Sequence, residues 1–197
     1  MADTKMTKSV GEHWACATLA RHGWAPALTR DGVERTDILA VAAHLTHRPT
    51  VEIQVKTTMS ESHRASWPLG EKAQLPDQSG HEWFVLVSVP PVPRQPRAYV
   101  VPRDHVAAAA WIVHMDWLTD PLAPSGKRNA PVAQARIKVQ NFEDYEDRWN
   151  LLPIPTQYVP VLLPPWLRDR SQEARVVFRK TTHGTRACPR GEKVGEW

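Results

Sequence analysis

Residues 36–58, TDILAVAAHLTHRPTVEIQVKTT, decide the fold of this chain. The first part, 36–43, is an apolar run bounded by polar turns, which is typical of a buried strand. The last part, 51–58, alternates strictly between apolar and polar residues and is rich in β-branched side chains, which is the strongest strand signal in the chain. A six-residue connection at 44–49 separates them. We therefore expect these two segments to form a β-hairpin.

Polar side chains gather on one face of this hairpin. The two-residue period of a strand places Glu52, Gln54 and Lys56 on the same face. A loop centred near residue 46 or 47 puts Asp37 across from Lys56. The same register pairs Leu39 with Gln54. Burial of such polar groups is unfavourable unless they are compensated, so this face either binds a metal ion or an anionic ligand, or is a solvent-exposed polar face.

The rest of the sequence predicts one helix before the hairpin, and strands and a second helix after it. Ser9 followed by Glu12 forms a capping-box pattern at a helix start, and Gly23 stands where that helix is expected to end. Asp104 is expected to cap a second helix that continues to about His114. Further strands are predicted at 24–28, 81–89, 98–101 and 135–139, a long loop at 59–80, and a final helix or turn at 142–152.

Composition narrows the class of protein. The chain has 197 residues, of which 42% are hydrophobic and 23% charged, as in ordinary globular domains. The longest apolar run, 106–113, is too short to span a bilayer, and no secretory signal is visible at the start. Two cysteines, at opposite ends of the chain, exclude a disulfide scaffold. We expect a cytoplasmic protein without a membrane partner.

The excess positive charge lies at the carboxyl end. Residues 153–197 hold eight Lys or Arg and four Asp or Glu, whereas residues 1–152 are neutral. Six of the 18 prolines also fall in this stretch. We therefore predict a domain at 1–152, with a boundary near 152–155, and an extended, partly irregular, basic arm at 153–197. The arm either adds affinity for phosphate or a partner protein, or is a solvated tail that keeps the protein soluble.

The order of these motifs resembles the PD-(D/E)XK nuclease superfamily. Gly11 and Glu12 on the first helix are followed by Asp37 on a strand and by Gln-Val-Lys at 54–56. This arrangement is similar to the Q-x-K variants of the Mrr-type and Holliday-junction-resolvase-like branches. The segments WPLGEKA (67–73), AYVVPRDHVA (98–107) and YEDRWNLL (145–152) extend the resemblance to roughly residues 9–152. It implies a restriction-endonuclease-like α/β fold, with a mixed sheet of four to five strands flanked by helices.

The resemblance also implies a set of metal ligands. Asp37 would be the principal carboxylate ligand, and Gln54 and the backbone carbonyl of Val55 would complete the set. The family more often has Asp or Glu at the position of Gln54, so the site has lost one negative charge. Glu52, on the same strand face, or Glu12 is the candidate to compensate. Oxygen ligands of this kind suit Mg²⁺ or Mn²⁺.

Catalytic and DNA-binding roles follow from the same resemblance. Lys56 would orient or deprotonate the attacking water and offset the charge of the transition state. Glu12 would hold a metal-bound water or a second ion, although the capping box alone explains it equally well. Phosphate contacts are predicted for Thr57 and Thr58, and for a basic rim formed by Arg30, Arg35, Arg64 and Lys72.

The predicted function is metal-dependent hydrolysis of phosphodiester bonds in DNA, in defence, repair or mobile-element processing. A homodimer would suit double-strand or junction cleavage. The alternative is a weakened nuclease fold that binds nucleic acid or a partner protein, and the neutral Gln54 favours it. A plain oligomeric scaffold is a third interpretation.

Overall fold

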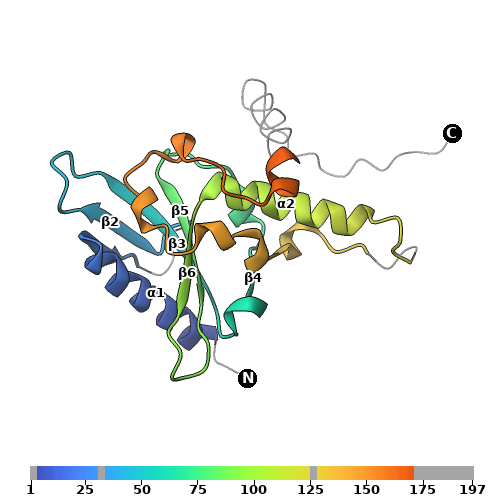
Figure 1. Ribbon diagram of the computed structural model, residues 1–197, viewed down its shortest axis with the longest axis horizontal. Helices are drawn as coiled ribbons and strands as arrows, with labels where there is room; N and C mark the ends of the chain where they lie inside the picture. Colours follow the sequence, from blue (N-terminus) through green and yellow to red (C-terminus); the bar gives the residue numbers. More distant parts are fainter. Residues whose placement is uncertain (1–3, 31–33, 125–127, 171–197) are drawn as a thin grey trace.

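The computed structural model describes residues 4–30, 34–124 and 128–170. At the centre of these residues is a five-stranded mixed sheet (Figure 1). In spatial order the strands are β1 (Trp24–Leu28), β2 (Ile38–Ala42), β3 (Thr50–Thr58), β5 (Glu82–Ser88) and β6 (Arg97–Pro102). β3 and β5 are parallel, and all other neighbours are antiparallel. The predicted mixed α/β class, with a sheet of four to five strands flanked by helices, is confirmed.

Helices and a smaller sheet cover the two faces of the large sheet. α1 (Thr4–Arg21) packs on one face and α2 (Arg103–Thr119) on the other (Figure 1). β4 (Ser66–Pro68) and β7 (Arg136–Lys138) form an antiparallel pair on the α2 side. The indole of Trp67 in β4 is buried and donates to the Val87 carbonyl of β5 at 3.0 Å. This hydrogen bond joins the small sheet to the large one.

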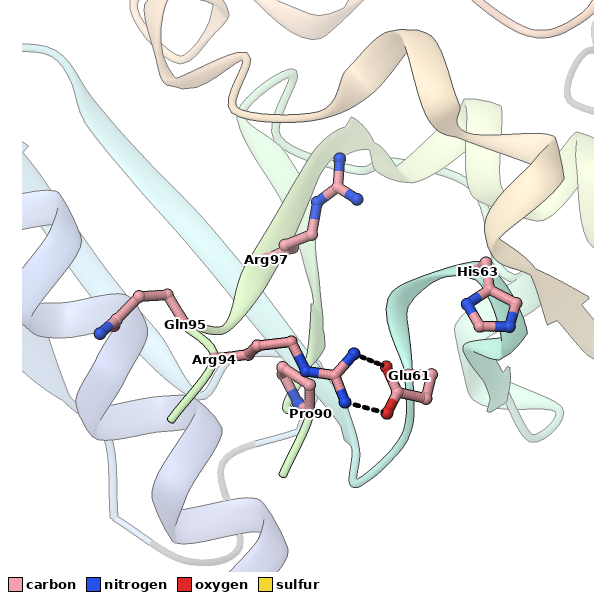
Figure 2. A pocket seen from close by; sticks show the side chains of 6 residues that line it. All are labelled: Glu61, His63, Pro90, Arg94, Gln95 and Arg97. Atoms are coloured by element: carbon pink, nitrogen blue, oxygen red, sulfur yellow. Dashed lines mark hydrogen bonds and ion pairs between the residues drawn. The ribbon is translucent and has the colours of Figure 1, made fainter. Parts of the chain in front are cut away.

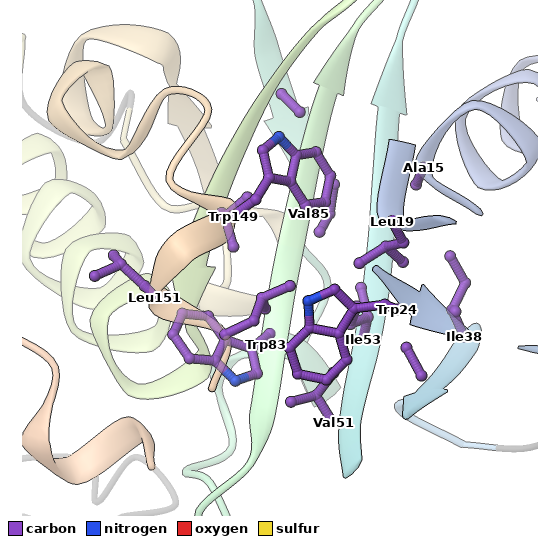
Figure 3. Close-up of a cluster of buried hydrophobic side chains, with 14 of the residues drawn as sticks. Ala15, Leu19, Trp24, Ile38, Val51, Ile53, Trp83, Val85, Trp149 and Leu151 are labelled. Carbon is purple, nitrogen blue, oxygen red and sulfur yellow. The ribbon is translucent and has the colours of Figure 1, made fainter. Parts of the chain in front are cut away.

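Alternation along β3 decides which side chains enter the core. Val51, Ile53 and Val55 are buried and pack with Leu19 of α1 and Trp83 of β5 (Figure 3). Each buried aliphatic side chain of this size stabilises the fold by about 1.5–3 kcal/mol relative to exposure. Glu52 and Gln54, which lie between them, and Lys56, which follows them, are directed to the opposite side of the strand because successive side chains alternate. The predicted polar face of β3 therefore exists.

The first helix begins earlier than its capping pattern predicts. α1 starts at Thr4, so Ser9 is inside the helix, where its hydroxyl lies 3.3 Å from Nδ1 of His13. The predicted Ser9–Glu12 capping box is therefore wrong. Glu12 is left without that structural explanation.

The β2–β3 register is shifted by two residues from the predicted one. Ile38 pairs with Ile53 and Leu39 pairs with Glu52, not with Gln54. The pairing extends to Val41 and Thr50, so the loop is centred nearer the chain start than expected. A shift of two keeps every side chain on its predicted face, because the side-chain period of a strand is two.

Two further local predictions need correction. α2 begins at Arg103 and is not capped by Asp104, whose carboxylate instead accepts a hydrogen bond from the Asp77 N–H at 2.8 Å. The predicted loop at 59–80 contains β4, which pairs with residues about 70 positions further along the chain. Short 3₁₀ helices form most of the remaining connections: Ser62–Arg64, Lys72–Gln74, Val132–Gln134, Val139–Asn141, Glu143–Tyr145, Trp149–Leu151 and Thr156–Tyr158.

The segment after the predicted domain boundary packs on the sheet and helices as far as it is described. Val159, Leu163 and Leu167 are buried in the two core clusters. The Leu162 N–H donates to the Tyr145 hydroxyl at 2.8 Å. Residues 171–197, which make up most of the predicted arm, lie outside the described residues. Within the described ranges, no helix is both long and apolar enough to cross a bilayer.

Candidate functional site

Asp37 is held against the end of the β2–β3 pairing by two backbone hydrogen bonds. Its N–H donates to the Ile53 carbonyl at 2.9 Å, and its Oδ2 accepts from the Val55 N–H at 2.8 Å. The N–H and C=O of one strand residue point to the same side. The Val55 carbonyl is therefore directed to the side of β3 on which the Asp37 carboxylate lies.

A glycine brings the first helix close enough to place a second carboxylate beside Asp37. A Cβ atom on Gly11 would lie 1.8 Å from Oγ1 of Thr57, so only glycine allows α1 to approach β3 at this point. The next residue along the helix is Glu12, whose carboxylate shares the Lys8 ammonium with Asp37 and lies within electrostatic range of that carboxylate. The close packing of α1 on β3 therefore explains the glycine at position 11, and it places Glu12 near Asp37.

An ammonium group lies between the two carboxylates. Lys8, one turn before Glu12 on α1, places Nζ 3.3 Å from Oε1 of Glu12 and 3.4 Å from Oδ1 of Asp37. Burial raises the pKa of Glu12, and the neighbouring Asp37 charge adds to this effect, while Lys8 opposes it. Burial lowers the pKa of Lys8, but the two carboxylates outweigh it, so the pKa of Lys8 is raised overall.

Lys56 shares the electrostatic environment of this cluster. Partial burial lowers its pKa, and the positive charges of Arg103 and Lys8 lower it further, while Asp37 opposes them. Glu12 and Asp37 therefore share the Lys8 ammonium, and Lys56 lies within electrostatic range of Asp37.

Gln54 is engaged by a buried arginine that the sequence analysis missed. Its Oε1 accepts a hydrogen bond from Nη2 of Arg103 at 3.0 Å. Arg103 is fully buried, and its Nε lies 2.6 Å from Oε2 of Glu82. Its guanidinium also stacks 4.7 Å from the ring centre of Phe84. Arg103, itself paired with Glu82, therefore positions the side-chain oxygen of Gln54. This placement does not support the predicted role of Gln54 as a metal ligand.

The other predicted ligand, Glu52, lies nearer the start of β3. Its Oε2 accepts a hydrogen bond from the Thr36 hydroxyl at 3.2 Å. This contact does not join it to Asp37 or Lys56, so the structure lends no support to Glu52 as a compensating ligand.

The predicted phosphate contacts are scattered. Oγ1 of Thr57 is buried against Gly11, and Nη2 of Arg35 forms an ion pair with Glu82 at 2.6 Å. Neither placement supports a contact with DNA. Lys72 is exposed but forms an ion pair with Glu34. Of the remaining three, Thr58 ends β3 and Arg30 and Arg64 are exposed.

A basic pocket lies at the end of the sheet where β3 terminates. The Val89 N–H donates to the Thr58 carbonyl, which places the loop after β5 beside the end of β3. The pocket has a volume of about 370 Å³ and is lined by Glu61, His63, Pro90, Arg94, Gln95 and Arg97 (Figure 2). Arg94 forms an ion pair with Glu61, and Arg97 forms one with Glu146. Both arginines therefore already have carboxylate partners.

The donor chemistry of the cluster fits a hard divalent cation. Glu12 and Asp37 supply carboxylate oxygens around a position that a cationic group, the Lys8 ammonium, already approaches. Among the described residues, no three His, Cys, Asp or Glu side chains are grouped to hold a metal. A closed protein cage is thus absent from this part of the chain. One or two carboxylates, water and a substrate oxygen are the usual ligands of Mg²⁺.

Comparisons with known proteins identify no family. No family model matches the chain, and no curated protein matches it. Among solved structures, the chain is similar to the bacterial homing endonuclease I-Ssp6803I, with 14% identity and a TM-score of 0.44. The alignment covers 80% of this chain and 98% of that one. A likeness of this degree establishes neither the family nor the activity of this chain.

Proposed function

We propose that this chain is a metal-dependent endonuclease that hydrolyses phosphodiester bonds in DNA. The observation that carries the proposal is the cluster of Glu12, Asp37 and Lys56, in which two carboxylates adjoin and an amine lies within their electrostatic reach. DNA as the substrate follows from the resemblance of the motif order to PD-(D/E)XK nucleases.

In this proposal Asp37 and Glu12 hold a Mg²⁺ or Mn²⁺ ion, with the Val55 carbonyl as a further ligand. The ion supplies Lewis-acid activation of a phosphate oxygen and of water. The Val55 N–H fixes the Asp37 carboxylate through Oδ2, which leaves Oδ1 for the cation. Such fixation keeps the ligand in place before substrate binds.

Lys56 orients the attacking water and offsets the negative charge on the phosphate oxygens in the transition state. Its lowered pKa means that it loses a proton more readily than an exposed lysine. Gln54 is not assigned to the metal, because Arg103 holds its side-chain oxygen. In this proposal Gln54 instead couples the strand to the Arg103–Glu82 ion pair.

A second candidate function is a nuclease fold that binds nucleic acid or a partner protein without cutting. Two observations favour it: Gln54 is neutral and engaged by Arg103, and the Lys8 ammonium lies between the carboxylates. Both reduce the attraction of the site for a divalent cation.

Cleavage assays separate the two functions. The full chain is incubated with double-stranded, branched and single-stranded DNA in Mg²⁺ or Mn²⁺. We expect cleavage that is lost in Asp37→Ala and Lys56→Ala but kept in Asp144→Asn and Lys138→Met, which change exposed residues elsewhere. Equal cleavage by all variants contradicts the site. A shift of DNA on a gel without cleavage in either metal supports the binding function instead.

A further inference from the structure

Lys8 takes a position that no catalytic assignment explains. It lies on the same helix face as Glu12, four residues earlier, so the pair forms the i,i+4 contact that is favourable on a helix. A local helix pair does not require a third partner. Yet the same Nζ also lies 3.4 Å from Oδ1 of Asp37, which belongs to a different element.

The contact between Lys8 and Asp37 offsets an unfavourable electrostatic interaction within the site. Glu12 and Asp37 are partly buried, with side-chain exposures of 14% and 18%. Two neighbouring carboxylates disfavour each other's ionisation, and burial adds to the penalty. A cation between them offsets both effects. Without a divalent ion, the Lys8 ammonium is in the position to do so.

The oxygen atoms that face Lys8 are those that a divalent cation would use. Oδ2 of Asp37 is already bound by the Val55 N–H, so Oδ1 is the atom directed to an added ligand. Lys8 approaches this Oδ1 and Oε1 of Glu12. The Lys8 side chain is 51% exposed, so it has room to swing into solvent.

We propose that Lys8 is a built-in counter-ion that holds Glu12 and Asp37 together in the metal-free protein and must be displaced when a divalent cation binds. This inference rests on the proposed function, because it uses the same two carboxylates. In this proposal Lys8 sets the affinity of the site for the divalent cation. The cation binds only at concentrations at which it competes with the ammonium group for the two carboxylates. The site then stays closed to cations at low metal concentration without losing its geometry.

The test measures metal binding directly, without nucleic acid. The full chain is freed of metal with a chelator and titrated with Mn²⁺, and free Mn²⁺ is followed by electron paramagnetic resonance. Lys8→Met removes the counter-ion, and Lys8→Arg keeps the charge. Lys5→Met removes the same charge from the same helix, one turn earlier, and serves as the matched control. Asp37→Asn removes the shared carboxylate.

We expect Lys8→Met to bind Mn²⁺ about 3- to 30-fold more tightly than the wild type, the range for loss of two competing ion pairs. We expect Lys5→Met and Lys8→Arg to stay near the wild type. The metal-free Lys8→Met protein should also melt a few degrees lower, by about 2–4 °C, because the carboxylates then repel each other uncompensated.

Unchanged affinity in Lys8→Met, with binding lost in Asp37→Asn, overturns the role of Lys8 and leaves the metal site intact. Wild-type affinity in Asp37→Asn places Mn²⁺ elsewhere, which refutes the proposed metal site and the counter-ion together. The two failures therefore give different results.

Discussion

Gly11→Ala tests the close approach of helix and strand that brings Glu12 to Asp37. The added Cβ would lie 1.8 Å from Oγ1, 2.8 Å from Cβ and 2.9 Å from Cγ2 of Thr57. Three contacts below 3.0 Å on a β-branched side chain cannot be relieved by a small rotation, since Thr is restricted at χ1. α1 must therefore move away from β3.

The expected cost combines two opposing effects. Overpacking of a fitted contact costs about 1–3 kcal/mol, whereas replacing an interior helical glycine by alanine gains about 0.5–1 kcal/mol. Because a 1.8 Å contact lies far inside van der Waals distance, the upper part of the first range applies, about 2–3 kcal/mol, and the net loss is about 1–2.5 kcal/mol. For a chain of this size it lowers the melting midpoint by about 2–10 °C. The displaced helix also carries Glu12 away from Asp37, so Mn²⁺ binding should weaken in parallel.

Urea denaturation followed by tryptophan fluorescence measures the free energy of unfolding. Thr57→Ala is the matched background, because it removes two of the three clashing atoms and a buried hydroxyl that lacks a hydrogen-bond partner among the described residues. Gly11→Ala should cost less in that background than in the wild type. If Gly11→Ala unfolds like the wild type in both backgrounds, the close approach is not what positions Glu12, and the reasoning fails.

Three further variants probe the neighbouring groups. Lys56→Met should stabilise the protein near pH 7, because burial lowers the pKa of Lys56 below its ordinary 10.5 and the protonated side chain therefore destabilises the fold. The wild type should regain this stability as the pH rises from the folded pKa of Lys56 toward 10.5. Urea denaturation should therefore show the difference in the free energy of unfolding between variant and wild type becoming smaller over that pH range. Gln54→Glu should pair with Arg103 and leave Mn²⁺ affinity within about threefold of the wild type, whereas a rise of tenfold or more in the same titration would place residue 54 in the metal shell. Arg103→Met should cost about 3–5 kcal/mol in urea denaturation, because it leaves buried Glu82 with one cation fewer, and a loss below about 1 kcal/mol would show that the ion pair is dispensable.

Local patterns were sufficient for the strands of the large sheet. The alternation at 51–58 and the apolar run at 36–43 each reflect one strand's own burial, so they are readable without knowledge of the neighbours. β4 was not predicted, because a three-residue strand that contains Pro68 has too little pattern of its own and depends on pairing with β7. The predicted start of α1 was wrong, because the spacing of Ser9 and Glu12 matches a capping box although Ser9 lies inside the helix, where its hydroxyl contacts His13.

Within the candidate site, the sequence could indicate only the residues that belong to the motif of the resembled family. Glu12 and Asp37 lie at one site with Lys8, and Lys56 lies within electrostatic range of Asp37, while the ligand and catalytic roles that the resemblance implies stay predictions. Lys8 was missed because its helix was expected to begin after it, although its spacing from Glu12 was a usable signal. Arg103 was missed because a charged residue at a helix start is normally read as solvent-exposed. Its burial depends on Glu82, 21 positions earlier, and only the fold brings the two together.

Anomalous diffraction from crystals grown or soaked with Mn²⁺ tests the central claim most directly. The account predicts an anomalous peak at about 2.1 Å from carboxylate oxygens of Asp37 and Glu12, with the Lys8 ammonium moved away from both. An anomalous map that is empty at this position at saturating Mn²⁺, with Lys8 still bridging the two carboxylates, would contradict the assignment of a metal-dependent active site to this chain.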